Sequence, residues 1–244
     1  GSTGDGYRLA ESCGHRISTC RPALVPLEAS DRFGGSLQPL QGLSLKNVSV
    51  KVLQDKKVLT EGFGEMLFTH FGVSGPLILS ASSLIAARLA EQKQLELEID
   101  WKPALTEEAL DARILRDFGE GMNKQIRHVL GGLLPQTVIP LMLTYAGISP
   151  EKPVRDITHA ERNSLVQEMK HFRLLITGTR GFAEAVITQG GIELKDIRPA
   201  TMESRLIRHL SFAGEVLDVD AMTGGYNLQI AWSTGYAAGK GVES

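Results

Sequence analysis

The sequence predicts an α/β fold, of the α+β kind, in which a main body is interrupted by a β-rich and a helical insertion. Three observations predict it. Near the C-terminus, an apolar run is followed by a loop and by a Gly-Gly pair that opens a segment with helical spacing. Between residues 43 and 101, apolar and polar residues alternate as in antiparallel strands. Between residues 104 and 171, the apolar spacing becomes that of helices, the first of them capped by Thr106.

The stretch from residue 211 to 227 carries the strongest local pattern. The run that ends in Gly214-Glu215 is expected to be a strand, and Gly224-Gly225 is expected to open a helix. The first N–H groups of a helix lack partners and its dipole is positive there, so anions and carbonyl oxygens bind at such a place. Glycines let a ligand approach the backbone, and Glu215 or Asp218 could accept hydrogen bonds from hydroxyls. The pattern indicates a pyrophosphate or flavin-type ligand.

The helix after Gly225 carries a stripe of small residues. Ala231, Gly235 and Gly239 recur at intervals of four and therefore share one face. Each glycine costs about 1 kcal/mol of helix stability relative to alanine, unless close packing compensates. We expect another segment to pack against this face.

Four stretches together resemble one known family. They are Gly1-Ser-Thr-Gly-Asp-Gly-Tyr7, Thr69-His-Phe-Gly-Val-Ser-Gly-Pro76, Thr177-Gly-Thr-Arg-Gly-Phe182 with Gly190-Gly191, and the run from Phe212 to Gly239. In this order they resemble the HI0933-like (BaiN-type) FAD-dependent oxidoreductases over essentially the whole chain. The resemblance implies a flavoprotein of the two-dinucleotide-binding type. It further implies FAD as cofactor, NAD(P)H as electron donor and hydride delivery to an unsaturated or oxidised small organic substrate.

One part of the family pattern is absent from the sequence. Family members begin with a Rossmann strand, a Gly-x-Gly-x-x-Gly turn and a helix, whereas no Gly-x-Gly here continues to a third glycine at that spacing. We therefore expect the C-terminal portion of a longer flavoprotein, truncated before this chain and unable to bind FAD alone. Its partner would be the missing N-terminal FAD-binding segment, whose first helix would pack on the small-residue stripe.

The resemblance assigns cofactor-binding residues to four places. The loop of Gly1, Ser2, Gly4, Asp5 and Gly6 would border the isoalloxazine ring, and Thr188, Gly190 and Gly191 would form a turn near the flavin. Gly214, Glu215 and Asp218 would bind the ribityl hydroxyls or the phosphate. The helix start would lie at the pyrimidine end of the ring or at the pyrophosphate, and it comprises Gly224, Gly225, Tyr226 and Asn227. Alternatively, Gly190 and Gly191 are ordinary turn residues without a function, and Gly1-Ser2 is a disordered or vector-derived terminus.

His70 is the catalytic candidate, as a proton donor to substrate or flavin. The alternative is a structural histidine beside Phe68 and Phe71. Ser74 is expected to cap the helix that begins at Pro76, because a nucleophile elbow would need glycine where Pro76 stands. Two other functions remain open: a non-enzymatic interaction or lid module formed by residues 23–200, and a serine hydrolase that uses Ser74 and His70.

The expected domain organisation has five segments. They are 1–22 (end of the first FAD-domain segment), 23–103 (first part of the β-rich insert), 104–171 (helical insertion), 172–200 (return of the β-rich part) and 201–244 (C-terminal FAD-domain segment). Within the return, strands at 172–176 and 182–188 are expected to form a hairpin through the turn at 177–181.

Composition excludes several partners. A net charge of −2 provides no positive electrostatic potential to attract nucleic acid or an anionic membrane. No apolar run reaches the roughly 18 residues that a membrane-spanning helix needs. With no signal-peptide pattern we expect a cytoplasmic protein, with Cys13 and Cys20 as reduced thiols rather than a disulfide. Asp218 and Asp220 lack the other ligands of a calcium loop, so no metal is expected.

Overall fold

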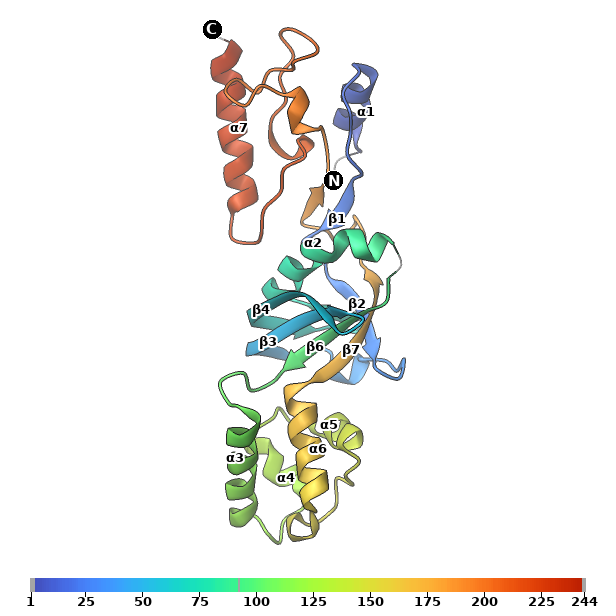
Figure 1. The fold of residues 1–244 in the computed structure, drawn as a ribbon, viewed down its shortest axis with the longest axis vertical. Helices are drawn as coiled ribbons and strands as arrows, with labels where there is room; N and C mark the ends of the chain where they lie inside the picture. The colour runs from blue at the N-terminus through green and yellow to red at the C-terminus, as the bar shows by residue number, and fades with distance from the viewer. Residues whose placement is uncertain (1–2, 92, 243–244) are drawn as a thin grey trace. The chain divides into compact units, whose positions relative to one another are not determined.

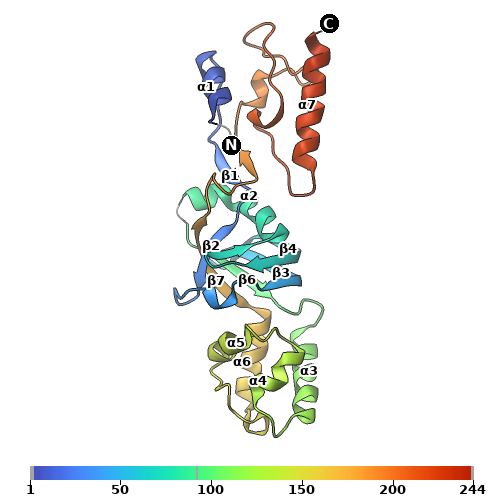
Figure 2. The ribbon, with the colours of Figure 1, turned by 180° about the vertical axis from the view of Figure 1, so that it is seen from behind.

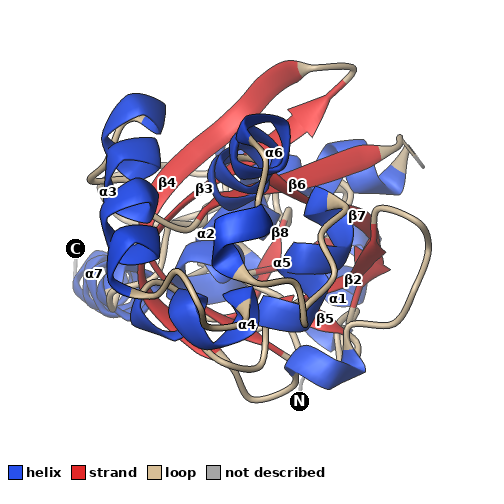
Figure 3. Cartoon of the chain, turned by 90° about the horizontal axis from the view of Figure 1, so that it is seen from below, coloured by secondary structure: helices blue, strands red, loops and turns tan. Residues whose placement is uncertain are grey.

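The computed structural model describes residues 3–91 and 93–242, and the chain divides into two compact units. The terminal unit consists of Gly1–Leu27, Ile78–Lys93 and Gly178–Ser244, and the barrel unit consists of Glu28–Leu77 and Gln94–Thr177. Both helices and strands are present (Figure 3), which confirms the predicted α/β fold class. The barrel unit also contains the stretch 104–171, where the sequence predicts a helical insertion.

Six strands close a barrel, in the order β2-β5-β4-β3-β6-β7 (Figure 1). They are β2 (Leu27–Asp31), β3 (Ser44–Gln54), β4 (Lys57–Phe68), β5 (Gly72–Ser74), β6 (Leu95–Asp100) and β7 (Phe172–Thr179). β3 pairs antiparallel with both β4 and β6, as the alternating sequence predicts. Its Val48, Val50 and Val52 are buried, since alternate side chains of a strand point to one face. β2 and β7, the two ends of the strand order, lie side by side (Figure 2).

Four helices follow β6 and gather at one end of the barrel (Figure 1). They are α3 (Glu107–Glu120), α4 (Ile126–Val129), α5 (Ile139–Ala146) and α6 (His159–Lys170). The Thr106 hydroxyl accepts a hydrogen bond from the Ala109 N–H, so the predicted cap is confirmed. α4 is short, since Leu130–Gly132 form a 3-10 turn in which two adjacent glycines disfavour continuation of the α-helix.

Aromatic side chains join the barrel to these helices. Phe68 of β4 stacks on Trp101 with ring centroids 6.2 Å apart, and Trp101 meets the edge of Phe172 at 5.6 Å. Tyr145 of α5 stacks on Phe172 from the helical side at 5.5 Å. Phe68 and Phe172 are fully buried, and burying each stabilises the unit by roughly 1.5–3 kcal/mol. The barrel and the helical insertion therefore share one core.

The terminal unit is assembled from three stretches of the chain. Its elements are α1 (Asp5–Ser12), β1 (Arg21–Ala23), most of α2 (Pro76–Ala90), β8 (Ile187–Gln189) and α7 (Tyr226–Val242), with 3-10 turns at Leu194–Asp196 and Gly214–Val216. β1 and β8 form a two-stranded antiparallel sheet. On α2, the buried Ser82 and Ser83 hydroxyls accept hydrogen bonds from the Val25 and Leu24 N–H groups at 3.0 and 2.9 Å. These bonds satisfy backbone donors that no strand pairs.

Two strand predictions in this unit are wrong. Residues before Glu215 form no strand: Gly214 has a φ of +74°, and its N–H donates to the Thr234 hydroxyl at 2.9 Å, so the chain turns as a 3-10 helix. The hairpin through 177–181 is also absent, because β7 belongs to the barrel while β8 pairs with β1. The Val186 N–H donates to the Leu24 carbonyl at 3.2 Å, which draws the chain to β1 instead.

The capping role predicted for Ser74 is wrong as well. Ser74 is the last residue of β5 and pairs with Leu67 of β4. Gly75, with a φ of +96°, separates it from the first helical residue, Pro76. A side chain at Gly75 would lie 3.0 Å from the Met66 Cα, so the tight strand-to-helix turn requires glycine there.

Candidate functional site

The predicted helix start at the end of the terminal unit is confirmed. α7 begins at Tyr226, directly after Gly224 (φ +118°) and Gly225 (φ +87°). Asn227 fixes the preceding loop, because its side-chain oxygen accepts from the Ala221 N–H and its side-chain NH₂ donates to the Ala221 carbonyl, both at 2.8 Å. The helix mouth, residues 224–227, therefore begins with two glycines whose backbone conformation favours glycine. The Tyr226 ring lies beside Gly224, where an added Cβ would be 3.2 Å from it.

A hollow of about 410 Å³ opens at the helix mouth. Its lining joins the mouth to the turn at Gly214–Val216 and to β8, and includes Leu24, Ile187, Gly214, Glu215, Gly224, Gly225, Asn227 and Ala231. Glu215 is the one ionisable side chain among its described lining residues. The structure thus brings Gly214, Glu215, Gly224, Gly225 and Asn227 together at one place.

Glu215 is held by the segment that contains Thr188. Its carboxylate accepts a hydrogen bond from the Thr188 N–H at 2.8 Å. Gly190 and Gly191 permit this approach, since a Cβ at Gly190 would lie 2.4 Å from the Thr19 carbonyl and one at Gly191 would lie 2.6 Å from the Val216 carbonyl. Their close backbone packing accounts for both glycines, while direct contact with a cofactor stays a prediction.

The N-terminal loop reaches the same turn. Gly4 (φ +77°) precedes α1, and a Cβ at Gly6 would lie 3.2 Å from the Val216 side chain. The Tyr7 hydroxyl donates to the Glu215 carbonyl at 3.3 Å. Asp5 pairs with the exposed Arg8. The predicted residues Gly1 and Ser2 lie outside the described residues. Gly4 and Gly6 line a hollow together with Glu215, whereas Asp5 contacts its neighbours Thr3 and Arg8.

A second hollow, of about 710 Å³, lies between α1, β8 and the Glu215 turn. Its polar lining comprises Thr3, Tyr7, Cys20, Thr188 and Glu215, and its apolar lining comprises Phe182, Ala185, Val186, Ile187 and Val216. Burial raises the pKa of the Tyr7 phenol, and nearby Cys20 and Glu215 raise it further. Burial also raises the pKa of the Cys20 thiol, and Asp218 adds to that effect.

Sequence reasoning did not single out Tyr7 or Cys20 as chemical groups. Tyr7 closes the glycine-rich N-terminal motif, and its position directly after Gly6 is the signal that could have marked it. Cys20 gave no such signal, because the partner that brings it to the hollow is 13 residues away in sequence. Both cysteines are free thiols, as predicted.

His70 belongs to the barrel unit, unlike the predicted cofactor residues. It lies exposed in the turn between β4 and β5, with its ring edge-on to Phe71 at 5.0 Å. Its catalytic role stays a prediction. Within residues 3–91 and 93–242, no group of three or more His, Cys, Asp or Glu side chains is arranged to hold a metal ion. None of the described helices combines the length and apolarity needed to cross a bilayer.

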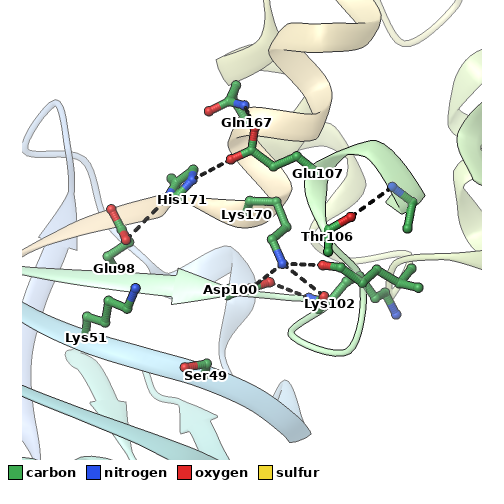
Figure 4. Close-up of polar contacts among 12 residues, drawn as sticks. Ser49, Lys51, Glu98, Asp100, Lys102, Thr106, Glu107, Gln167, Lys170 and His171 are labelled. Carbon is green, nitrogen blue, oxygen red and sulfur yellow. Dashed lines mark hydrogen bonds and ion pairs between the residues drawn. The ribbon is translucent and has the colours of Figure 1, made fainter. Parts of the chain in front are cut away.

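The barrel unit has a polar hollow of its own, of about 400 Å³, where α3 and α6 meet the barrel strands (Figure 4). His171 lies between two carboxylates, with Nδ1 3.2 Å from Glu98 and Nε2 3.2 Å from Glu107. The His171 contact lowers the pKa of Glu107. Lys170 pairs with Asp100 at 2.6 Å and donates to the Leu105 carbonyl at 2.6 Å. Since these groups satisfy one another, the cluster joins the helical insertion to the barrel.

The small-residue face of α7 meets the Gly214 turn at Ala231, while Gly235 and Gly239 face open space among the described residues. No described α7 residue is buried, and Trp232 and Tyr236 are 68% and 67% exposed. A Cβ added at Gly235 or Gly239 would meet nothing within 4 Å. The packing of a further segment on this face stays a prediction.

Known proteins match this architecture. The family described as "HI0933-like protein barrel and H2TH domain" matches residues 21–187, which include the barrel and its helical insertion. The 3-dehydro-bile acid delta(4,6)-reductase of Clostridium scindens is 34% identical over 98% of this chain and 58% of its own length. The ribosomal RNA dihydrouridine synthases of Haemophilus influenzae and Escherichia coli are 33% and 29% identical, each over 97% of this chain and over 55% and 56% of their own lengths.

The barrel with its inserted helices corresponds to the barrel and helical domain that the family description names. The chain belongs to the HI0933-like family. It spans a little over half the length of the curated relatives it matches.

Proposed function

We propose that this chain forms part of an FAD-dependent oxidoreductase that takes electrons from NAD(P)H and delivers hydride to a carbon–carbon double bond of a small organic substrate. The observation that carries the proposal is the helix mouth at Gly224-Gly225, which opens on a hollow together with Glu215. The names of the relatives support the direction of the reaction, because a delta(4,6)-reductase and a dihydrouridine synthase both add hydrogen to a double bond.

The residues at the helix mouth fit a flavin dinucleotide. Gly224 and Gly225 have positive φ angles and no side chains, and a carbonyl or phosphate oxygen can approach such a backbone closely at a helix start. Glu215 can accept hydrogen bonds from hydroxyls at the rim of the same hollow. FAD, when bound, supplies the two-electron chemistry, while the helix start stabilises the negative charge that develops on reduction.

FAD binding further requires, in our proposal, a segment that covers α7. The exposed Trp232 and Tyr236 and the uncovered Gly235 support this, since a helix with large exposed aromatic side chains is rarely stable in isolation from a partner. Such a segment would bind the ADP half of FAD, because this chain has no Gly-x-Gly-x-x-Gly turn that could do so.

A flavin spectrum tests both parts of the proposal. The purified 244-residue chain should be colourless, whereas protein that also carries the upstream FAD-binding segment should be yellow. The yellow protein should oxidise NAD(P)H when a small conjugated enone is added. A stoichiometric flavin spectrum from the 244-residue chain would refute the need for a second segment, and a colourless longer protein would refute FAD binding itself.

The dihydrouridine synthase relatives favour a second candidate, in which the reduced double bond is that of uridine in ribosomal RNA. The net charge of −2 opposes it, because RNA-binding surfaces are usually basic. The 710 Å³ hollow also has no lysine or arginine among its described lining residues. Incubation with protein-free ribosomal RNA and NAD(P)H, followed by nucleoside analysis for dihydrouridine, distinguishes the two candidates.

A further inference from the structure

We propose that Tyr7 is a catalytic acid: its phenol delivers the proton that completes reduction of a double bond conjugated to a carbonyl, in a substrate bound in the 710 Å³ hollow. This inference rests on the proposed function. It assigns the substrate to the hollow between α1, β8 and the Glu215 turn, and it assigns to the phenol the step that the flavin does not supply.

The Tyr7 hydroxyl lies where a proton donor must lie. Tyr7 is in the first turn of α1, half-buried, and its side chain lines the hollow. Its hydroxyl is 3.3 Å from the Glu215 carbonyl and also hydrogen-bonds with the Cys20 thiol and the Thr188 hydroxyl. Three different segments of the chain therefore position one O–H group at the polar wall of the hollow.

The opposite lining suits a neutral, apolar substrate. Phe182 and Val186 are 58% and 64% exposed although both are large apolar side chains, and both line the hollow. Glu215 is the one ionisable carboxylate among the described lining residues, and its carboxylate is engaged by the Thr188 N–H. A flat apolar molecule with one carbonyl group matches a lining that combines apolar side chains with hydroxyl and thiol groups.

The reaction balances with the groups named. FAD, when bound and reduced, would supply the hydride: addition of that hydride to the β-carbon would form a C–H bond and break the π bond, which leaves the substrate as an enolate. The Tyr7 O–H bond then breaks and its proton forms a C–H bond at the α-carbon. The phenolate regains a proton from water at the open hollow. The substrate thus gains one hydride and one proton, the reduced flavin would lose that hydride and become oxidised, and water restores the proton to Tyr7.

The protonation state of the phenol agrees with this role. A proton donor must hold its proton at neutral pH, and burial together with Cys20 and Glu215 raises the pKa of Tyr7 above its ordinary value. An enolate carbon is a stronger base than a phenolate, so the transfer is favourable once hydride has been added. Cys20 acts as a positioning residue, because its thiol hydrogen-bonds with the phenol and also donates to the Ser18 carbonyl at 3.7 Å.

The test compares Tyr7→Phe with Tyr145→Phe in the flavin-loaded enzyme. Tyr145 is the matched control, because it loses the same hydroxyl in the barrel unit and keeps its ring on Phe172. Stopped-flow spectroscopy measures flavin reduction by NAD(P)H and flavin reoxidation by a small enone separately. We expect Tyr7→Phe to leave flavin reduction within about twofold and to slow reoxidation by about 10²- to 10⁴-fold, the usual contribution of general acid catalysis. Tyr145→Phe should leave both rates unchanged.

Product analysis in heavy water gives a second readout. Wild-type enzyme should place one deuterium at the α-carbon on a single face, and the residual product of Tyr7→Phe should lose that facial selectivity. A Tyr7→Phe variant that reoxidises at the wild-type rate with intact selectivity overturns the proposal, as does a Cys20→Ser variant that alone abolishes the step. If wild-type enzyme shows no flavin reduction by NAD(P)H, the proposed function fails rather than the assignment of Tyr7.

Discussion

The two units of this chain differ in how they bury their apolar side chains. The barrel unit surrounds Phe68, Trp101 and Phe172 with its own strands and helices. The terminal unit instead ends in α7, whose described residues include none that is buried although the helix carries a tryptophan and two tyrosines. The barrel unit therefore provides its own core, whereas the terminal unit leaves the large aromatic side chains of α7 exposed on its surface. The cofactor site that we propose lies at the start of that helix.

The largest expected effect is loss of the barrel core. Phe172→Ala removes the ring that Trp101 and Tyr145 both contact, so the free energy of unfolding should fall by about 3–5 kcal/mol. Urea denaturation followed by tryptophan fluorescence measures the loss. Leu115→Ala, at a 45% exposed position of α3, is the control and should change stability by less than about 0.5 kcal/mol. An equal effect of both substitutions would show that the barrel unit has no self-sufficient core.

The next effect concerns the turn that supports Glu215. In Gly191→Ala the new methyl group would lie 2.6 Å from the Val216 carbonyl, at a φ of +151°. The segments would have to separate, which weakens the 2.9 Å bond from the Ile192 N–H to the Val216 carbonyl. We expect a loss of about 1–3 kcal/mol in the terminal unit. Hydrogen exchange at Ile192 measures it locally, and unchanged protection of that amide would contradict the predicted packing.

Much of the barrel unit could be predicted from the sequence, because its strands and helices follow local periodicity. The alternation in β3 and the Thr106 cap are both local patterns that the structure confirms. The terminal unit was predicted less well. The segment before Glu215 has the composition of a strand, yet the partner of the Gly214 N–H is Thr234, 20 residues further on. Periodicity carries no information about such distant partners.

The same reasoning applies to the candidate site. Gly224-Gly225 could be found from sequence because a helix start has a local signature. For Tyr7 the sequence offered only its position after Gly6, and for Cys20 it offered nothing, since their place in the hollow depends on the backbone turn at Glu215 and on β8. Ser74 was misassigned because the sequence Ser-Gly-Pro fits a cap at serine, whereas strand pairing with Leu67 determines its place.

A third prediction is that one substitution in α7 stabilises the 244-residue chain but weakens FAD retention in a longer, flavin-loaded protein. Gly235→Ala meets nothing within 4 Å among the described residues, so the 244-residue chain should become more stable by up to about 1 kcal/mol through better helix propensity. If a second segment packs closely on the stripe, the same methyl group should weaken FAD retention in the flavin-loaded protein. Thermal unfolding of the chain and flavin release from the longer protein measure the two effects. Gly119→Ala, which also meets nothing within 4 Å near the end of α3, is the matched control.

The smallest effect should appear as a pH dependence of the barrel unit. Glu161 accepts hydrogen bonds from Lys152 at 2.6 Å and from the Thr158 N–H at 2.8 Å, and these contacts lower its pKa. A carboxylate whose folded-state pKa is lowered stabilises the fold above its unfolded pKa of about 4.3, and that stability is lost as the pH falls through the folded pKa. Glu161→Gln should therefore cost about 0.5–1 kcal/mol at neutral pH, the scale of a capping interaction, and almost nothing at low pH.

Chemical denaturation across the acidic range separates this effect from general acid destabilisation. The stability curves of the wild type and Glu161→Gln should converge as the pH falls, because protonation removes the same charge that the substitution removes. Glu151→Gln, at a side chain 59% exposed, should run parallel to the wild type throughout. Parallel curves for Glu161→Gln would mean that α6 depends on the shared aromatic core rather than on its cap.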